Sequence, residues 1–476
     1  MNPITVADVP APGPCSFSYD PNEFVARIRE VALASQRVST RQGKGDSRIT
    51  CPLIEFYGAT GQGKSWLLSH LRAEFRHDPQ SDSPHPFSVL IDLGDFPDRE
   101  HSSALLQALA NQLGEQVGAE TVPSVEERDE VAAEALGKYL HDLGRELVPV
   151  LLFDTADQAD DEFLDWIEEH LIYPAIRGDA VIFVFASRTR LRWKKFEVRR
   201  RVESRELGSF ERPQTGEQIE QLRGEKPDGE TITALWNYSF GHPLTTRVIY
   251  DTLCHFNPDA PLDGVETWEE KLVQVVYDLI EKHFFASVKQ RELRELIWNI
   301  CVLRKFNVAH LREFADIEEQ NALSRINELV ASTLVRWSSE DGGYVFDPVV
   351  RQILARNLQM REQERYLKQH EAAAATYERW IQKYPRNAGD FLIEWMVHQT
   401  EVWRVKGESD DEIASRSATK FQRRLDQLRD DPQAQWDLPD VARALDERLL
   451  KREDMGLQTA LGELQQTARS FVAQYA

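Results

Sequence analysis

One glycine-rich segment of the sequence has the residue types and spacing to hold phosphate. Residues 58–65 read GATGQGKS and fit the pattern GxxxxGK[ST], between the apolar run LIEFY and the helical run SWLLSHL. Glycines allow the backbone N–H groups to turn toward phosphate oxygens, and the helix that follows adds the positive end of its dipole. In this pattern Lys64 contacts the β and γ phosphates and Ser65 contacts Mg²⁺. The segment predicted to line a nucleotide comprises Gly58, Ala59, Thr60, Gly61, Gln62, Gly63, Lys64, Ser65 and Trp66. A glycine-rich turn that binds nothing is the alternative.

A run of acidic residues follows a second apolar segment, in PVLLFDTADQADD. The apolar run ends at Asp154, and ligands bind at the carboxyl ends of strands in parallel sheets. We expect Asp154 to hold Mg²⁺ together with Ser65. Asp157 could position a water molecule or cap the next helix, and the sequence favours neither. For Asp160 and Asp161 a capping role is favoured.

A third apolar run, AVIFVFA, ends in SRTR. The planar guanidinium of Arg188 would match phosphate oxygens there, so Arg188 is a candidate to detect a γ phosphate. The stretch RTRLRWKKFEVRRRVESR that follows is densely basic. A solvated surface is the simpler interpretation. The alternative hypothesis is that Arg199, Arg200 and Arg201 dock an acidic subunit surface or nucleic acid.

The elements that must position these residues form an α/β pattern. Four short apolar runs, at 53–57, 87–93, 148–153 and 180–186, alternate with helical segments. This alternation predicts a P-loop core with a mostly parallel sheet and helices on both faces. We expect the core to span residues 51–210. It follows an amino-terminal segment, residues 1–50, with one helix at Asn22–Ala34.

The remainder of the chain is predicted to be mainly helical. Residues 211–286 are expected to form an all-helical lid domain. Residues 287–358 contain three helical segments and then a hairpin around Asp341–Gly343, which is the order of a winged helix. Residues 359–476 are expected to form a helical carboxyl-terminal region. Its last helix carries an apolar stripe that should pack on a neighbouring helix. The stripe comprises Leu457, Leu461, Leu464, Ala468 and Phe471.

Composition restricts the partners. Lys and Arg number 57 and Asp and Glu 79 in 476 residues, a net charge of −22, which argues against broad contact with nucleic acid or an anionic membrane. The first 18 residues lack a secretory pattern, and no apolar run approaches the roughly 20 residues of a membrane span. The four cysteines, Cys15, Cys51, Cys254 and Cys301, are too widely spaced for a zinc ribbon and predict reduced, mostly buried thiols. We therefore expect a cytoplasmic protein.

Four segments in this order resemble the STAND class of P-loop signalling NTPases, relatives of the nucleotide-binding domains of plant resistance proteins and apoptotic activators. They are GATGQGKS, LLFDTAD, FVFASR and the GHP of Gly241–Pro243, and the resemblance covers residues 20–360. It implies that Asp157 positions water and that Pro243 lies against the nucleotide. Pro243 as a helix start is the alternative. The segment FVAR, Phe24–Arg27, resembles the one that closes over the adenine in such proteins.

The winged-helix segment departs from that family. Many relatives have a His–Asp pair there, whereas this chain reads VFDPVVRQ, with Phe346 before Asp347. Direct nucleotide sensing by this segment is therefore in doubt, and whether Arg351 substitutes is open. Recognisable sensor repeats and an effector domain are also missing.

The resemblance implies an ATP-binding, slowly hydrolysing switch, with ATP/ADP and Mg²⁺ as cofactors. ADP would hold the lid and winged helix closed, and ATP would favour an open, self-associating form that acts on an effector protein in trans, in bacterial defence or signalling. The alternative function is a nucleic-acid-acting ATPase or transcription regulator that uses its winged helix. Its third helix, about residues 319–332, has only Arg325 as a cation, so a packing role is favoured. A GTPase is disfavoured because no [NT]KxD motif follows.

Overall fold

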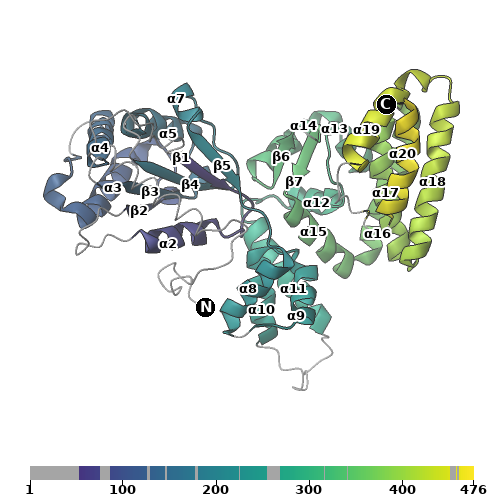
Figure 1. The fold of residues 1–476 in the computed structure, drawn as a ribbon, viewed down its shortest axis with the longest axis horizontal. Helices are drawn as coiled ribbons and strands as arrows, with labels where there is room; N and C mark the ends of the chain where they lie inside the picture. Colours follow the sequence, from purple (N-terminus) through teal and green to yellow (C-terminus); the bar gives the residue numbers. More distant parts are fainter. Residues whose placement is uncertain are drawn as a thin grey trace. The chain divides into compact units, whose positions relative to one another are not determined.

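The chain folds into two compact units, Met1–Asp263 and Gly264–Ala476. We describe each unit by itself, using a computed structural model (Figure 1). The residues that the structure describes are 53–75, 86–125, 129–144, 147–176, 181–224, 226–254, 268–315, 317–339, 341–450, 457 and 460–475. The helix expected at Asn22–Ala34 and the segment Phe24–Arg27 lie outside these residues. None of the described helices is both long and apolar enough to cross a membrane.

A parallel sheet forms the centre of the first unit, and its strand order is β2-β3-β4-β1-β5. The strands are β1 (Leu53–Tyr57), β2 (Phe87–Asp92), β3 (Pro149–Asp154), β4 (Ile182–Ser187) and β5 (Val202–Glu206). The first four confirm the predicted runs. The fifth corrects the sequence analysis, which placed its residues in a basic surface stretch. Because β5 is an edge strand of sequence VESRE without a fully buried residue, it carries no apolar signal.

The register of the sheet brings the ends of its strands to one edge. Tyr57 of β1 pairs with Ser187 of β4, and Asp92 of β2 pairs with Asp154 of β3. Because all five strands are parallel, the residues that follow them lie at the same carboxyl edge. The glycine-rich loop follows β1, so it shares this edge with the two aspartates.

Helices cover both faces of the sheet, because successive residues of the central strands are buried on both faces. Along β3, Leu151 and Phe153 face one apolar core, while Val150 and Leu152 face the other. The second core is covered by α2 (Lys64–Glu74). The first core is covered by the helices α3 (Ser102–Val117), α4 (Asp129–Leu143), α5 (Asp161–Trp166), α6 (Tyr173–Ala175) and α7 (Phe196–Arg199). The predicted α/β core is therefore confirmed.

Three helices follow the sheet within the first unit. They are α8 (Arg212–Arg223), α9 (Gly229–Ser239) and α10 (Pro243–Cys254). Local signals set their ends: Glu211 and Gln214 form a capping box for α8, and Asp228 caps α9 by accepting from the Thr231 backbone N–H. Phe240 is left-handed at the end of α9, and Gly241 follows it with φ of 71°. The chain thereby reverses and starts α10.

The second unit begins with helices and one small antiparallel sheet. Its first elements are α11 (Trp268–Leu279), α12 (Arg291–Ile300), α13 (Val308–Phe314), α14 (Glu319–Ala331), β6 (Val335–Ser338) and β7 (Gly343–Phe346). The two strands form a hairpin, and Phe306 extends it because its N–H and C=O both bond with Tyr344. Within residues 287–358, the three helices α12, α13 and α14 are followed by the hairpin, which is the predicted order of elements.

The carboxyl-terminal helices pack side by side on one another (Figure 1, green to yellow). They are α15 (Pro348–Arg361), α16 (Gln363–Lys383), α17 (Ala388–Val405), α18 (Asp410–Asp430), α19 (Leu438–Leu445) and α20 (Leu461–Tyr475). Helix α20 packs on α18 and α19, and its Leu464, Ala468 and Phe471 are buried. The predicted stripe therefore covers neighbouring helices of the same unit.

A buried polar cluster joins several of these helices. We use that name for Arg304, His310, His370, Tyr377, Glu394 and His398. The Arg304 guanidinium donates to both carboxylate oxygens of Glu394, at 3.0 and 2.7 Å. His310 lies 3.1 Å from the Tyr377 hydroxyl, and the Nδ1 atoms of His370 and His398 are 2.9 Å apart. Outside the cluster, Nδ1 of His310 lies 2.8 Å from the side-chain oxygen of Asn307.

Candidate nucleotide site

The loop between β1 and α2 has the conformation that a phosphate-binding loop requires. Gly61 and Gly63 have φ of 86° and 87°, in the left-handed region that other residues avoid. Gly63 immediately precedes α2, and no described side chain caps this helix. The first N–H groups of α2 therefore face the loop, where an anion is favoured by their partial positive charge.

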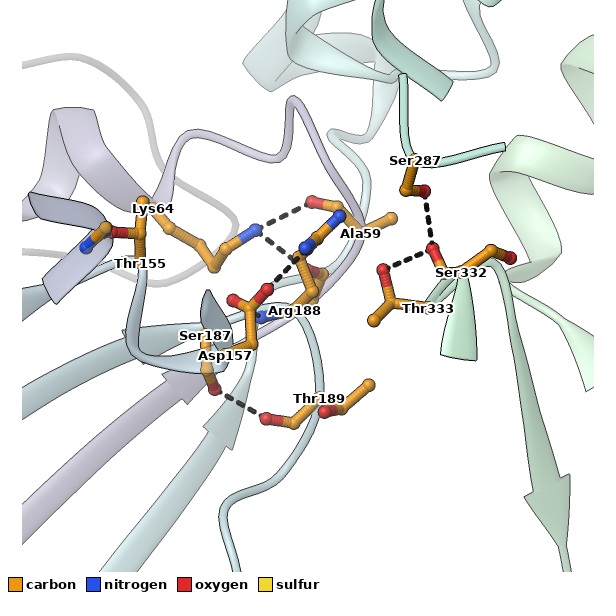
Figure 2. A network of polar contacts seen from close by, with 12 residues as sticks. Ala59, Lys64, Thr155, Asp157, Ser187, Arg188, Thr189, Ser287, Ser332 and Thr333 are labelled. Atoms are coloured by element: carbon orange, nitrogen blue, oxygen red, sulfur yellow. Dashed lines mark hydrogen bonds and ion pairs between the residues drawn. The ribbon is translucent and has the colours of Figure 1, made fainter. Parts of the chain in front are cut away.

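Lys64 reaches back across this loop. Its ammonium donates to the carbonyl oxygens of Gly58 at 2.7 Å and Ala59 at 2.9 Å (Figure 2). The Lys64 ammonium group thus lies at the loop, on the same edge of the sheet as Asp154. A positive charge at this place suits the terminal phosphates of a nucleotide.

Ser65 and Asp154 come from different elements and meet at this edge. The Ser65 hydroxyl lies near enough to the Asp154 carboxylate to influence its pKa, and the Thr155 backbone N–H donates to this carboxylate at 2.8 Å. Burial raises the pKa of Asp154, and repulsion from Asp92 adds to that effect. Three neighbours act in the opposite direction. The pKa of Asp154 is lowered by the Ser65 hydroxyl, the Thr155 N–H and the Lys64 ammonium. A cation at this position would favour the charged form of the carboxyl group.

Asp92 is a site residue that the sequence analysis missed. It ends β2 in register with Asp154, accepts from the Gly94 N–H at 2.9 Å and bonds to the Thr155 hydroxyl. It therefore fixes the residue that follows Asp154. The run FSVLID ends in an aspartate as PVLLFD does, and that parallel was the available signal.

The oxygen donors at this edge fit magnesium. Among the described residues, no group of three or more His, Cys, Asp or Glu side chains could enclose a metal ion by itself. Mg²⁺ usually takes one or two protein oxygens and completes its shell with phosphates and water. The hydroxyl of Ser65 and the carboxylate of Asp154 match that donor set.

The two predicted catalytic residues pair with each other. Asp157, in the turn after β3, accepts from the backbone N–H of Arg188 at 2.7 Å and from its Nε (Figure 2). The Asp157 side chain is only 7% exposed and that of Arg188 26%. Within the described part of the chain, the NH1 and NH2 atoms of Arg188 make no hydrogen bond.

Of the neighbouring aspartates, Asp160 caps α5 by accepting from the Phe163 N–H at 2.6 Å, as predicted.

The start of α10 lies against the glycine-rich loop. The Leu244 N–H donates to the Gly61 carbonyl at 3.2 Å, and a ring nitrogen of His242 lies 2.8 Å from the Thr60 carbonyl. Pro243 is buried between them and begins the helix, and its carbonyl accepts from Gln218 at 2.9 Å. The sequence analysis singled out the proline of GHP, whereas the contacts with the loop are made by its two neighbours.

Two further residues of the loop segment contact the rest of the unit. Gln62 is buried, and its amide donates to the Ser209 hydroxyl at 3.5 Å. Trp66, on α2, lies under the guanidinium of Arg247 of α10, 5.6 Å from the ring centroid. Both contacts connect the loop and α2 to residues that follow the sheet.

The predicted winged-helix residues have structural partners in the second unit. Asp347 accepts from the N–H groups of Val349 and Val350 at 3.0 and 3.2 Å and so caps α15. Phe346 is buried against Phe306, with ring centroids 5.7 Å apart. Burial lowers the pKa of Arg351.

The basic stretch after β4 is partly neutralised within the first unit. Lys194 and Lys195 pair with Asp165 and Glu169, and both their backbone N–H groups donate to buried Glu168 at 2.8 Å. Arg201 donates to the Ile176 carbonyl at 2.7 Å. Arg199 and Arg200 are exposed. The docking hypothesis therefore concerns fewer cations than the sequence suggested.

Comparisons with known proteins agree with this site. Residues 48–192 match the family model described as AAA domain. No curated protein matches the sequence significantly. Taken with the loop geometry, the match indicates a P-loop NTPase domain of the AAA-related type over these residues.

Solved structures that resemble the chain do so at low identity. One is a STAND protein with a tetratricopeptide repeat sensor from Pyrococcus horikoshii, at 15% identity and a TM-score of 0.29, covering 94% of this chain and 64% of that one. Our chain thus spans 64% of the length of that protein. The ORC2 protein of Aeropyrum pernix, in ADPNP–ADP complexes, has 13% identity and a TM-score of 0.40, over 72% and 93% of the two chains. The ORC1 protein of Aeropyrum pernix, in complex with DNA, has 14% identity and a TM-score of 0.39, over 74% and 94%.

Proposed function

We propose that the protein is an ATP-binding and slowly hydrolysing molecular switch of the STAND type. The observation that carries this proposal is the docking of α10 on the glycine-rich loop, through Leu244 N–H and the Gly61 carbonyl. A helix outside the sheet that bonds directly to the phosphate-binding loop would respond to what the loop holds. The proposal takes residues 211–286 as the lid domain and 287–358 as a winged helix.

Each site residue has a role in this proposal. The loop from Gly58 to Ser65 would bind the nucleotide phosphates, with Lys64 donating to the terminal ones. Ser65 and Asp154 would hold Mg²⁺, which when bound neutralises phosphate charge. Pro243 would border the nucleotide from the lid.

Arg188 and Asp157 would act as a pair in the same site. Asp157 fixes the Nε side of the guanidinium, which leaves the terminal NH1 and NH2 groups to meet a γ phosphate. Each carboxylate oxygen of Asp157 accepts one bond from Arg188 and keeps a further lone pair, with which it would position a water molecule while the pair stays intact. Because the bonds from Arg188 make the carboxylate a weaker base, hydrolysis would be slow.

The nucleic-acid alternative has weaker support. Arg325, the single cation of α14, is bonded to Glu328 and Gln290, each at 2.8 Å. A helix that reads DNA usually presents such a side chain to the bases. We therefore favour a packing role for the three helices and hairpin, and an effector protein in trans as the partner of the ATP state.

Mass measurement in solution tests the switch. The wild-type chain is expected to associate with itself when Mg²⁺ and ATP are present and to remain smaller with ADP, whereas Lys64→Ala should show the same mass with both. If the wild-type protein has the same mass with ATP and with ADP, the proposed ATP-dependent self-association is wrong. Steeply salt-dependent binding to a random DNA duplex would instead favour the alternative.

A further inference from the structure

His242 occupies an unusual place between the lid and the glycine-rich loop. It directly precedes α10 and its side chain is fully buried. One ring nitrogen, Nε2, lies 2.8 Å from the Thr60 carbonyl oxygen. The other, Nδ1, lies 2.8 Å from the Thr245 hydroxyl and 3.3 Å from the Thr245 backbone nitrogen. The ring therefore bridges the start of a helix and the phosphate-binding loop.

These partners assign the protons of the ring. A carbonyl oxygen only accepts, so Nε2 must carry the proton that points at Thr60. Nδ1 can then accept from Thr245, whose backbone N–H belongs to the first turn of α10 and needs an acceptor. One neutral imidazole thus caps the helix with one nitrogen and binds the loop with the other.

The bond to Thr60 fixes the orientation of one peptide group. Peptides in the described chain are trans, so the N–H of Gly61 points opposite to the carbonyl of Thr60. His242 holds that carbonyl toward the lid, and Leu244 holds the next one, that of Gly61, on the same side. The Gly61 N–H is therefore directed away from the lid, and no described residue accepts from it.

The contact is too close for the loop and lid to shift independently. A Cβ atom on Gly61 would lie 2.6 Å from Cε1 of His242 and 2.8 Å from Cβ of Leu244. Rotation of this peptide would thus require α10 to move. Conversely, departure of α10 would release both carbonyls.

We propose that His242 is a positioning residue, which holds the Thr60–Gly61 peptide so that the Gly61 N–H is presented to a nucleotide phosphate. The inference rests on the proposed function, because it assumes that the loop binds a nucleotide. Phosphate binding to the loop and docking of the lid on the loop are then thermodynamically coupled. A lid that is docked strengthens phosphate binding, and a bound phosphate strengthens docking by the same factor.

Two substitutions separate the two halves of the imidazole. His242→Asn places an amide near the position of Nδ1, so it still caps α10 but is too short to reach Thr60. His242→Gln places an amide nitrogen near the position of Nε2, so it still donates to Thr60. Thr245→Val, which keeps the backbone N–H, serves as a third variant that alters only the hydroxyl partner of the ring.

The experiment measures binding of Mg²⁺–ADP by calorimetry, and then competition by pyrophosphate and by adenosine against a fluorescent ADP. His242→Asn should weaken ADP and pyrophosphate roughly five- to tenfold and leave adenosine unchanged, since one hydrogen bond to the phosphate group is lost. His242→Gln should stay within about twofold of wild type, and Thr245→Val should lose about two- to threefold. Melting temperatures show that each variant is folded.

The outcomes separate the inference from the function. If folded His242→Asn binds pyrophosphate as tightly as wild type, or loses adenosine and pyrophosphate equally, His242 does not position the loop. If His242→Asn fails to fold, His242→Gln carries the test, and a folded His242→Gln that binds pyrophosphate more than about fivefold more weakly than wild type contradicts the inference, because this variant keeps the donor to Thr60. If wild type binds neither ADP nor ATP, the proposed function itself is wrong.

Discussion

The two units each gather charged and polar side chains, but they do so in opposite ways. In the first unit Lys64, Ser65 and Asp154 lie at the edge of a sheet, on a loop, a helix start and a strand end. In the second unit the buried polar cluster lies inside a helical core, where Glu394 is 2% exposed. Both places shift pKa values: that of Asp154 is raised, and that of Glu394 is lowered to about 2. A shifted pKa alone therefore does not mark a functional site. The useful distinction is whether the groups face a place that a ligand can enter.

The comparison predicts that the buried polar cluster serves stability. Glu394→Ala would leave the Arg304 charge buried without its partner, which costs about 3–5 kcal/mol in the free energy of unfolding. Arg304→Met combined with Glu394→Leu should cost less, because the Arg304 charge is removed together with its partner. Urea denaturation measures both. The ADP affinity of the first unit should stay unchanged, and a loss of ADP affinity at native stability would contradict the assigned role.

Acid should weaken the second unit through its histidines. Burial lowers the pKa of His310 to about 4 and that of His398 to about 3. In the unfolded chain both have a pKa of about 6.5, so the unfolded state takes up protons first as the pH falls. The stability contributed by the neutral rings is fully present above about pH 6.5 and is lost toward pH 4 and below, by a few kcal/mol.

Hydrogen exchange of α16 and α17 between pH 7.5 and 4.5, corrected for the intrinsic rate, detects this change. His310→Gln should show a shallower loss of protection than wild type, while His101→Gln, at a partly exposed position, should follow wild type. Equal pH dependence in all three chains would show that the buried rings do not control acid stability.

Two glycines of the loop allow a matched test of its contact with the start of α10. Gly61 and Gly63 have nearly the same positive φ, but only at Gly61 would a Cβ atom meet His242 and Leu244, since nothing lies within 4 Å of one at Gly63. Gly63→Ala should cost about 1–2 kcal/mol of stability from backbone strain. Gly61→Ala adds overpacking of about 1–3 kcal/mol and should weaken ADP binding further. Thermal unfolding measures the stability of the two variants, and calorimetry measures their ADP affinity. Equal losses in both variants would argue against tight docking of α10.

The smallest effect is expected at the basic stretch. Arg199→Glu with Arg200→Glu alters only exposed side chains and should change stability by less than about 0.5 kcal/mol. Arg201→Ala should cost about 1 kcal/mol, because the Ile176 carbonyl loses its donor. If the double charge reversal also leaves self-association and polyanion binding unchanged, the docking hypothesis for this stretch is excluded.

Much of the fold follows from periodicity in the sequence. The apolar runs that became β1 to β4 are buried on both faces, and three helices followed by a hairpin lie in the order predicted for residues 287–358. Strand β5 could not be predicted in this way, because an edge strand with polar residues lacks that signal.

The candidate site was predictable where motifs are local. Lys64 and Ser65 follow from the spacing of GATGQGKS, and Asp154 from its place after an apolar run. The pairing of Asp157 with Arg188, and the bond of His242 to Thr60, join residues 31 and 182 positions apart. Such contacts depend on the order of the strands and on where α10 packs, which residue spacing does not encode.

The most direct test of the account is calorimetric titration of the full chain with Mg²⁺–ADP and Mg²⁺–ATP. Wild type should bind both nucleotides, and Lys64→Ala should bind them roughly a hundredfold more weakly, because charge-assisted hydrogen bonds to phosphate are lost. Lys138→Ala, at an exposed position on α4, should match wild type. A folded wild-type chain that releases no heat with either nucleotide, or a Lys64→Ala chain that binds as wild type does, would contradict the assignment of the glycine-rich loop as a nucleotide site.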